Sequence, residues 1–177
     1  MSFYLDVPFV TQLGIGAHVD PATARDDPTG CWYASLCMVG YYFEAGPRLG
    51  NPELFNKPLD KNIHGTDVGH FPIGGAAELK MMQNEGLEEV PEPADKKWKG
   101  WQLAKLLKEY GPLMMSWRAP GAHVSVVIGV DTDKNQVIYH DPENAPNSRM
   151  SLNDFNTKLM WGNRALIRRK GQPHQKR

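Results

Sequence analysis

The stretch Thr29-Gly-Cys-Trp-Tyr-Ala-Ser35 places a cysteine at the point where a glycine-ended loop meets the start of a predicted helix. From Cys31 to about Glu44 the apolar residues recur at helical spacing, and Gly46-Pro47 then ends the helix. At a helix N-terminus, the free amide hydrogens and the helix dipole favour a thiolate over a neutral thiol. Cys31 is therefore a candidate nucleophile, set against the common alternative of a small buried apolar residue.

The second cysteine, Cys37, lies in the same predicted helix. At a rise of about 1.5 Å per residue, the two cysteine Cα atoms are about 9 Å apart, which is too far for a disulfide bond. We expect Cys37 to be a buried, inert thiol. Two unpaired cysteines also fit a reducing compartment.

Length and charge restrict the class of protein. The chain has 177 residues with 20 basic and 20 acidic side chains, which predicts a single domain over residues 1–170 followed by a basic, flexible tail over 171–177. This balance argues against a nucleic-acid-binding protein. The longest apolar run, Val124–Val130, is too short to span a membrane.

The N-terminal residues Met-Ser-Phe-Tyr-Leu-Asp have neither the basic region nor the long apolar region of a Sec signal peptide. We therefore expect the protein to be cytoplasmic in the producing cell or delivered into the cytoplasm of a target cell.

Helical patterns dominate the first part of the chain and strand patterns the last part, which predicts an α+β fold. In this fold a helical lobe carrying the Cys31 helix packs on a C-terminal antiparallel sheet. Helices are expected over 31–44, from Asn51 to before Pro58, over 74–85, over 100–110 and after the capping box 151–154. Strands are expected over 113–117, 123–130, 136–140 and 165–167, with a hairpin turn over 131–135.

A thiolate nucleophile needs an imidazole as its proton partner, and His123 is the best placed of the six histidines. It follows the loop 119–122 and begins a β-branched strand. The hairpin turn places residues 123–125 opposite 141–143, so Asp141 emerges at the same end as His123. A carboxylate there can accept the second imidazole N–H, although an Asp-Pro pair is also a common turn starter.

An acyl-transfer site also needs donors for the oxyanion. The Cys31 backbone N–H is one candidate, and the Gln12 side chain is the other. Gln12, Cys31-Trp32, His123 and Asp141, in this order, resemble the papain-like cysteine peptidases. The closer similarity is to the double-glycine (bacteriocin-processing) peptidases and to bacterial effector proteases of plant pathogens.

This resemblance implies a papain-like fold in which Cys31 is the nucleophile, His123 the general base, Asp141 the orienting carboxylate and Gln12 the oxyanion-hole donor. The chemistry that this resemblance implies needs no cofactor. Two features depart from the family pattern. The charged loop over 13–30 lengthens the segment between Gln12 and Cys31, and His140 stands where an asparagine often precedes the Asp-Pro pair.

The expected function is a cysteine endopeptidase that acts on a protein substrate, with cleavage after Gly-Gly as the specificity that the resemblance implies. We expect a bacterial toxin or effector domain delivered to a target cell, with an immunity or inhibitor protein covering its cleft. One alternative is a deamidase, transglutaminase or cell-wall amidase with the same triad. The other is a binding module with a vestigial site.

Two further patterns are assigned ordinary structural roles. The loop His64-Gly-Thr-Asp-Val-Gly-His70 lacks a cysteine or second carboxylate at useful spacing, so no metal site is expected there. The acidic residues between Glu85 and Asp95 are predicted to form a solvated face.

Overall fold

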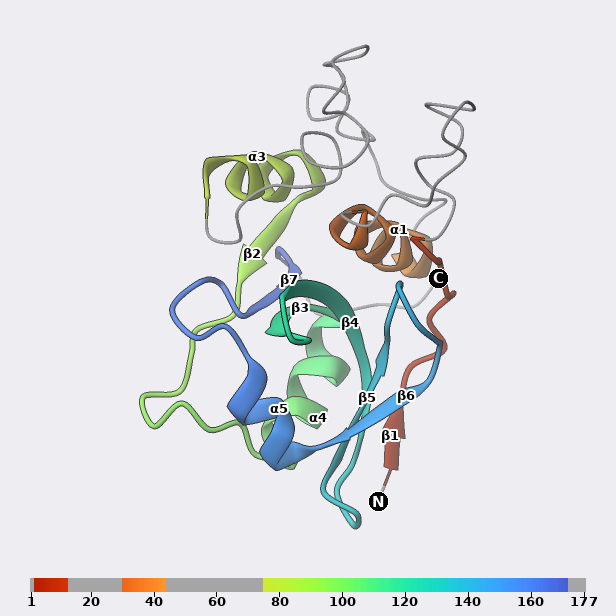
Figure 1. Ribbon diagram of the computed structural model, residues 1–177, viewed down its shortest axis with the longest axis vertical. Helices are drawn as coiled ribbons and strands as arrows, with labels where there is room; N and C mark the ends of the chain where they lie inside the picture. Colours follow the sequence, from red (N-terminus) through yellow and green to blue (C-terminus); the bar gives the residue numbers. More distant parts are fainter. Residues whose placement is uncertain (1, 13–29, 44–74, 172–177) are drawn as a thin grey trace.

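The computed structural model describes residues 2–12, 30–43 and 75–171 (Figure 1). Several predicted features lie outside the described residues: the loop over 13–29, the helix from Asn51, the His64–His70 loop and residues 172–177 of the basic tail.

An antiparallel seven-stranded sheet forms the centre of the described structure, with strands in the order β2-β7-β3-β4-β5-β6. Strand β1 pairs with the far part of β4, from Ser2↔Asp131 to Tyr4↔Gly129. The strands are β1 Ser2–Tyr4, β2 Leu87–Glu89, β3 Leu113–Arg118, β4 Ala122–Asp131, β5 Gln136–His140, β6 Ser148–Ser151 and β7 Leu166–Arg169. The helices are α1 Cys31–Phe43, α3 Ala76–Glu85, α4 Gly100–Tyr110 and α5 Leu152–Lys158.

The predicted α+β class is confirmed, and the described elements lie close to their predicted bounds. Gly86 ends α3 in the left-handed conformation, with φ 65° and ψ 45°, as expected of a C-terminal glycine. The Ser151 side chain caps α5 by accepting a hydrogen bond from the Asp154 amide. Strands β1, β2 and β6 were not predicted, because each has only three or four residues and lacks a clear apolar alternation.

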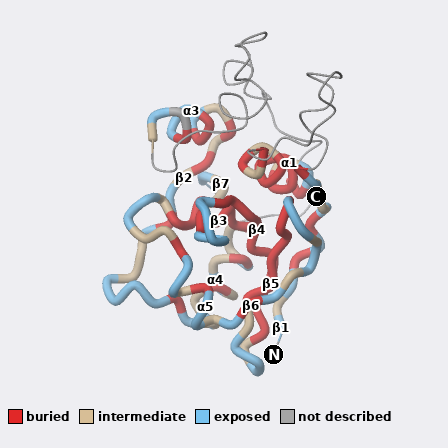
Figure 2. Tube along the Cα trace, viewed as in Figure 1, coloured by how far each residue is buried: buried red, intermediate tan, exposed pale blue. Residues whose placement is uncertain are grey.

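The central strands carry the core. Every residue of β3 is buried except Arg118, and every residue of β4 is buried except Ala122. Figure 2 shows this burial along β3, β4 and β5 and over most of α1. Helices α1 and α4 both pack against β4, so the helix that carries Cys31 is held directly on the central strand. Within the described ranges, no helix is long and apolar enough to cross a membrane.

Candidate active site

Cys31 is the first residue of α1, and a buried hydrogen bond one turn later anchors this helix to the sheet. The Ser35 hydroxyl donates to the Val124 carbonyl oxygen at 3.2 Å. Val124 directly follows His123 in β4, so the bond holds the start of α1 beside the start of β4. Sequence reasoning missed Ser35, although a polar residue four positions after Cys31, on the face that packs inward, was a usable signal.

His123 and Asp141 are directly bonded, as the predicted hairpin geometry requires. The distance from His123 Nε2 to Asp141 Oδ1 is 2.7 Å, and both residues are buried. Strands β4 and β5 pair from Asp131↔Gln136 up to Val126↔His140, and Asp141 follows immediately. The imidazole Nε2–H therefore donates to the carboxylate, which leaves Nδ1 as the second nitrogen of the ring.

The Asp141 carboxylate is held by the turn that follows β5. Its Oδ1 atom also accepts the Glu143 amide at 3.1 Å. The Asn144 amide donates to the Asp141 carbonyl at 3.1 Å, and the Asp141 amide donates to Ala145 at 3.0 Å. These bonds orient the carboxylate before any substrate binds, and the carboxylate in turn orients His123.

The pKa of His123 is strongly raised above its usual value. Burial lowers the pKa of His123, but hydrogen bonds to Asp141 and Cys31 and the charges of both groups outweigh burial and raise the pKa to about 9. A side-chain hydrogen bond to Cys31 means that the thiol and the imidazole are neighbours. Near neutral pH the imidazole is thus protonated, and it lies beside the Cys31 sulfur.

An aromatic side chain, Trp117, covers the imidazole from β3. Trp117 pairs with His123 across the β3–β4 ladder, and the two rings lie 5.8 Å apart at an angle of 57°. The indole N–H donates to the Ser125 hydroxyl at 3.0 Å, which fixes the ring. A buried indole excludes water from the His123–Asp141 bond and strengthens it. Sequence analysis placed Trp117 on a strand but did not connect it with the site.

The segment that carries Gln12 is joined to the same turn. The backbone N–H of Gln12 donates to the Pro142 carbonyl oxygen at 2.8 Å, and the Thr11 hydroxyl donates to the same oxygen at 3.1 Å. Gln12 itself is buried. The structure thus brings the predicted residue Gln12 beside the Asp141-Pro142 pair.

His140 holds this entry segment further back. Its Nε2 atom lies 2.7 Å from the Val7 carbonyl oxygen, and its Nδ1 atom accepts the Asn147 amide at 3.1 Å. The Phe9 ring packs edge-on against the imidazole. Burial lowers the pKa of His140, opposed by the bond to Val7, and the neutral ring satisfies both partners. His140 thus connects the entry segment and the turn over 141–147.

The remaining cysteine behaves as expected. Cys37 is buried and unpaired, and desolvation raises the pKa of its thiol to about 11 despite a hydrogen bond to Tyr33. No disulfide joins it to Cys31, since both are free.

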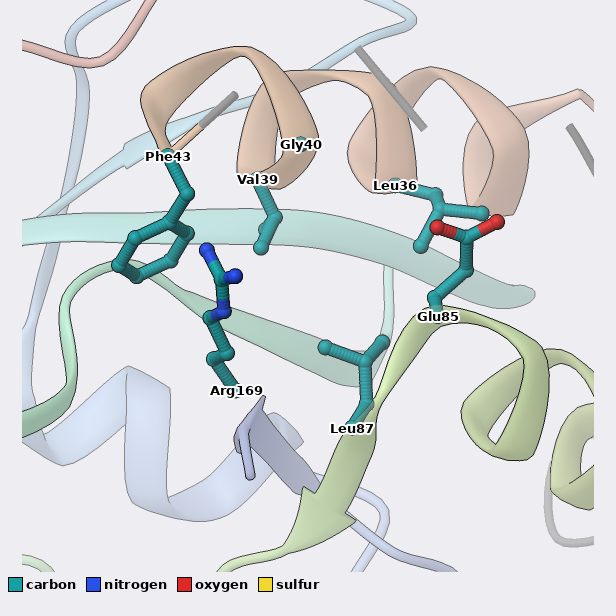
Figure 3. A pocket seen from close by; sticks show the side chains of 7 residues that line it. All are labelled: Leu36, Val39, Gly40, Phe43, Glu85, Leu87 and Arg169. Carbon is teal, nitrogen blue, oxygen red and sulfur yellow. The ribbon is translucent and has the colours of Figure 1, made fainter. Parts of the chain in front are cut away.

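A small cavity beside later turns of α1 is lined by Leu36, Val39, Gly40, Phe43, Glu85, Leu87 and Arg169 (Figure 3). Its volume of about 20 Å³ has room for about one water molecule. Such a space is too small to bind a peptide.

The predicted solvated acidic face is wrong in part. Glu85 is buried and lines the cavity, Glu88 pairs with Arg168 at 2.7 Å, and Glu92 accepts the Gly162 amide at 2.9 Å. Glu89 and Asp95 are exposed as predicted. Packing of α3 on β2 and pairing of β2 with β7, which the local pattern does not encode, account for the difference.

The geometry describes a thiol at a helix start, an imidazole beside it, and a buried carboxylate behind the imidazole. These parts are those of a thiol hydrolase of the papain-like class. In the described part of the chain, no group of three or more histidine, cysteine, aspartate or glutamate side chains could hold a metal ion.

Comparison with known families agrees with this class. The model of the family described as papain-like cysteine protease AvrRpt2 matches residues 10–160, which is most of the chain. The chain therefore belongs to this family of bacterial effector proteases, and it is a papain-like cysteine protease. Its substrate is accordingly a protein.

Proposed function

We propose that the protein is an endopeptidase in which Cys31, His123 and Asp141 form the catalytic triad. The observation that carries this proposal is the buried contact of 2.7 Å between His123 Nε2 and Asp141, made by an imidazole whose other neighbour is the half-buried Cys31 thiol. The raised pKa of His123 supports the same assignment, because it keeps on the imidazole, beside the Cys31 sulfur, the proton that the leaving amine needs.

In the proposed reaction, the Cys31 thiolate attacks the scissile carbonyl carbon, and the carbonyl electrons move onto oxygen. His123 Nδ1–H then protonates the departing amine, which breaks the C–N bond and leaves an acyl-thioester. The neutral imidazole next removes a proton from water while the water oxygen bonds to the thioester carbon; the C–S bond then breaks, which releases the acyl group as a carboxylic acid and restores the Cys31 thiolate and the protonated imidazole. Asp141 accepts the Nε2–H and keeps the ring oriented throughout.

We propose the Cys31 amide and the Gln12 side chain as the oxyanion donors. The amide belongs to the first residue of α1, where backbone N–H groups have no partner within the helix. Two observations support Gln12. The residue is buried, and its backbone N–H donates to the carbonyl oxygen of Pro142, which is next to Asp141.

The deciding experiment compares new protein N-termini in a lysate treated with wild type and with Cys31→Ala. Cleavage by wild type alone is expected, and Cys37→Ala is the matched control because it removes the buried thiol of the same helix. Equal cleavage by wild type and Cys31→Ala would rule out the proposed nucleophile. If Cys37→Ala folds but does not cleave, the nucleophile would be Cys37 and not Cys31.

We further propose cleavage after Gly-Gly, which rests on the resemblance to double-glycine peptidases. Two peptides that differ only by Gly-Gly or Ala-Ala before the scissile bond provide the test. Preferential cleavage of the Gly-Gly peptide is expected, and equal cleavage would remove this specificity from the proposal.

For the biological role, we propose an effector or toxin that acts inside a target cell and is countered by an immunity or inhibitor protein over the cleft. Intracellular expression of wild type should slow growth, while Cys31→Ala should not. Equal growth of the two strains would contradict the toxic role without affecting the enzymatic proposal.

A further inference from the structure

A second and larger pocket, here called the α4 pocket, is lined by α4, by the residues that follow β2, and by β7. Its volume of about 390 Å³ is within the range of about 300 to 1,000 Å³ that is typical of ligand sites. Among the described residues that line it, none is Cys31, His123 or Asp141. Helix α4 begins at Gly100, which lies against Thr132, just past the end of β4 that is farther from His123. The α4 pocket is therefore separate from the proposed triad.

Aromatic side chains form much of the wall of the α4 pocket. Trp98, Trp101 and Tyr110 all line it. Trp101 is 62% exposed, the largest value among the large apolar side chains that the structure describes. Leu103 and Leu107 of the same helix are fully buried, so the core has its apolar contacts from α4 without Trp101. An indole left in water beside a pocket with two further aromatic walls is typical of a binding site.

Two side chains of this wall have buried N–H groups without an acceptor. The indole Nε1 of Trp98 has no hydrogen-bond partner among the described residues, although the side chain is buried. The same is true of Nε and Nη1 of Arg168, whose Nη2 lies 2.7 Å from Glu88 and whose guanidinium stacks on the Tyr110 ring at 3.5 Å. Buried N–H groups ordinarily have a partner, because leaving water without one costs free energy. The α4 pocket therefore has too few hydrogen-bond acceptors.

Charge, by contrast, is already balanced in the α4 pocket. The Arg168 guanidinium has the Glu88 carboxylate. The Lys105 ammonium lies 3.9 Å from the Glu109 carboxylate. An anionic ligand would compete with these two pairs. Since indole and guanidinium N–H groups can only donate, the complementary ligand is a neutral one that offers acceptor oxygens and apolar groups and brings few N–H donors of its own.

We propose that the α4 pocket binds a proline-rich segment of another protein. A proline residue offers a carbonyl oxygen but no N–H, and its ring is an apolar surface that packs on aromatic side chains. In the polyproline II conformation the carbonyl oxygens have no internal partner, so they are available to donors such as Trp98 and Arg168. Grooves lined by aromatic side chains bind such segments in several kinds of domain. This binding does not involve Cys31, so it is independent of the proposed nucleophile.

A labelled decaproline peptide tests the proposal on the full chain, with fluorescence anisotropy as the measurement. Wild type should bind decaproline saturably and should not bind a labelled Gly-Ser peptide of the same length. Trp101→Ala should weaken the binding of decaproline about tenfold or more, as expected when a tryptophan anchor is removed from an interface. Tyr41→Ala is the matched control, because it removes an exposed aromatic side chain from α1, and it should bind as wild type does.

A second variant, Trp98→Phe, tests the unpaired donor. It keeps an aromatic ring in the wall but removes the indole N–H. The affinity for decaproline should fall about two- to tenfold, as expected for the loss of one hydrogen bond to the ligand. Unchanged affinity in a folded Trp98→Phe would overturn the assignment of this N–H to the ligand. Trp101 is exposed, so Trp101→Ala tests the pocket even where Trp98→Phe does not fold.

Binding at the active site and self-association are the two competing outcomes. Alkylation of Cys31 with iodoacetamide should leave the affinity for decaproline unchanged, and loss of binding after alkylation would place the peptide in the active site and overturn the proposal. Equal binding by wild type and Trp101→Ala, or no binding by wild type, would also overturn it. Wild-type dimers that Trp101→Ala dissociates, without any decaproline binding, would assign the α4 pocket to a second copy of the chain instead.

Discussion

The β4–β5 hairpin carries two histidines at the same end, and the groups that the two rings bond to are different. His123 bonds to a carboxylate and a thiol, and its pKa rises to about 9. His140 bonds to a backbone carbonyl and a backbone amide, and burial lowers its pKa. Both rings are buried to a similar extent. The chemistry of each ring is therefore set by whether its partners are ionised, since burial alone lowers the pKa in both cases.

This difference separates a ring that is the proton donor of the proposed reaction from a ring that joins two backbone segments. His123 lies between the Asp141 carboxylate and the Cys31 thiol. His140 connects Val7 with Asn147 and so organises the segments that lead to Gln12 and away from Asp141. Replacing His123 should consequently lower activity, whereas replacing His140 should lower stability.

The largest effect is expected for His123→Ala. Loss of the proton partner should lower kcat/KM by about 10⁵-fold, because removing a triad member eliminates most of the catalysis that the triad supplies. Steady-state kinetics with circular dichroism as a check on folding would measure this. A well-folded His123→Ala that keeps a tenth of wild-type activity would show that His123 is not the base.

The next effect concerns the charge that raises the His123 pKa. Asp141→Asn keeps an oxygen that can accept the Nε2–H but removes the negative charge. We expect kcat/KM to fall by roughly 10²- to 10⁴-fold. The alkaline limb of the pH profile, set by loss of the imidazolium near pH 9 in wild type, should move to lower pH. An unmoved limb would mean that Asp141 does not control the imidazole.

His140→Phe should affect stability rather than the chemical step. It keeps an aromatic ring beside Phe9 but leaves the Val7 carbonyl and the Asn147 amide without their imidazole partner. The free energy of unfolding should fall by about 2 kcal/mol, as expected for lost buried hydrogen bonds. Urea unfolding would measure this loss. An unchanged urea midpoint would show that the bonds from His140 to Val7 and Asn147 do not stabilise the fold. Rapid alkylation of Cys31 should persist in the folded variant.

The smallest effect is in the pH dependence of stability. The native pKa of His140 is lowered, so its contribution is complete above about pH 6.5 and is lost as the pH falls below that value. The native pKa of His123 is raised, so its contribution is complete below about pH 6.5 and is lost as the pH rises through about 9. His140→Phe should reduce the acid-side slope and leave the alkaline-side slope unchanged. Equal acid-side slopes in the two proteins would contradict this assignment.

The features predicted successfully from sequence depend on short-range rules. Helix α1 and its glycine-preceded start follow from spacing, and the β4–β5 turn follows from composition. The approach of His123 to Asp141 was predictable because a hairpin turn determines which residues face one another. The edge strands β1 and β2 were not predictable in this way, because each pairs with a partner far away in the chain.

The sequence by itself determined the class of chemistry: a thiol at a helix start, and an imidazole and a carboxylate at one end of one hairpin. Only the tertiary structure decided how these parts are held together and what surrounds them. Ser35 reaches Val124, and His140 reaches Val7, across separations of 89 and 133 residues. No periodicity encodes contacts between such distant segments. They form because packing α1 and the entry segment on β4 and β5 brings polar groups out of water, where each needs a partner.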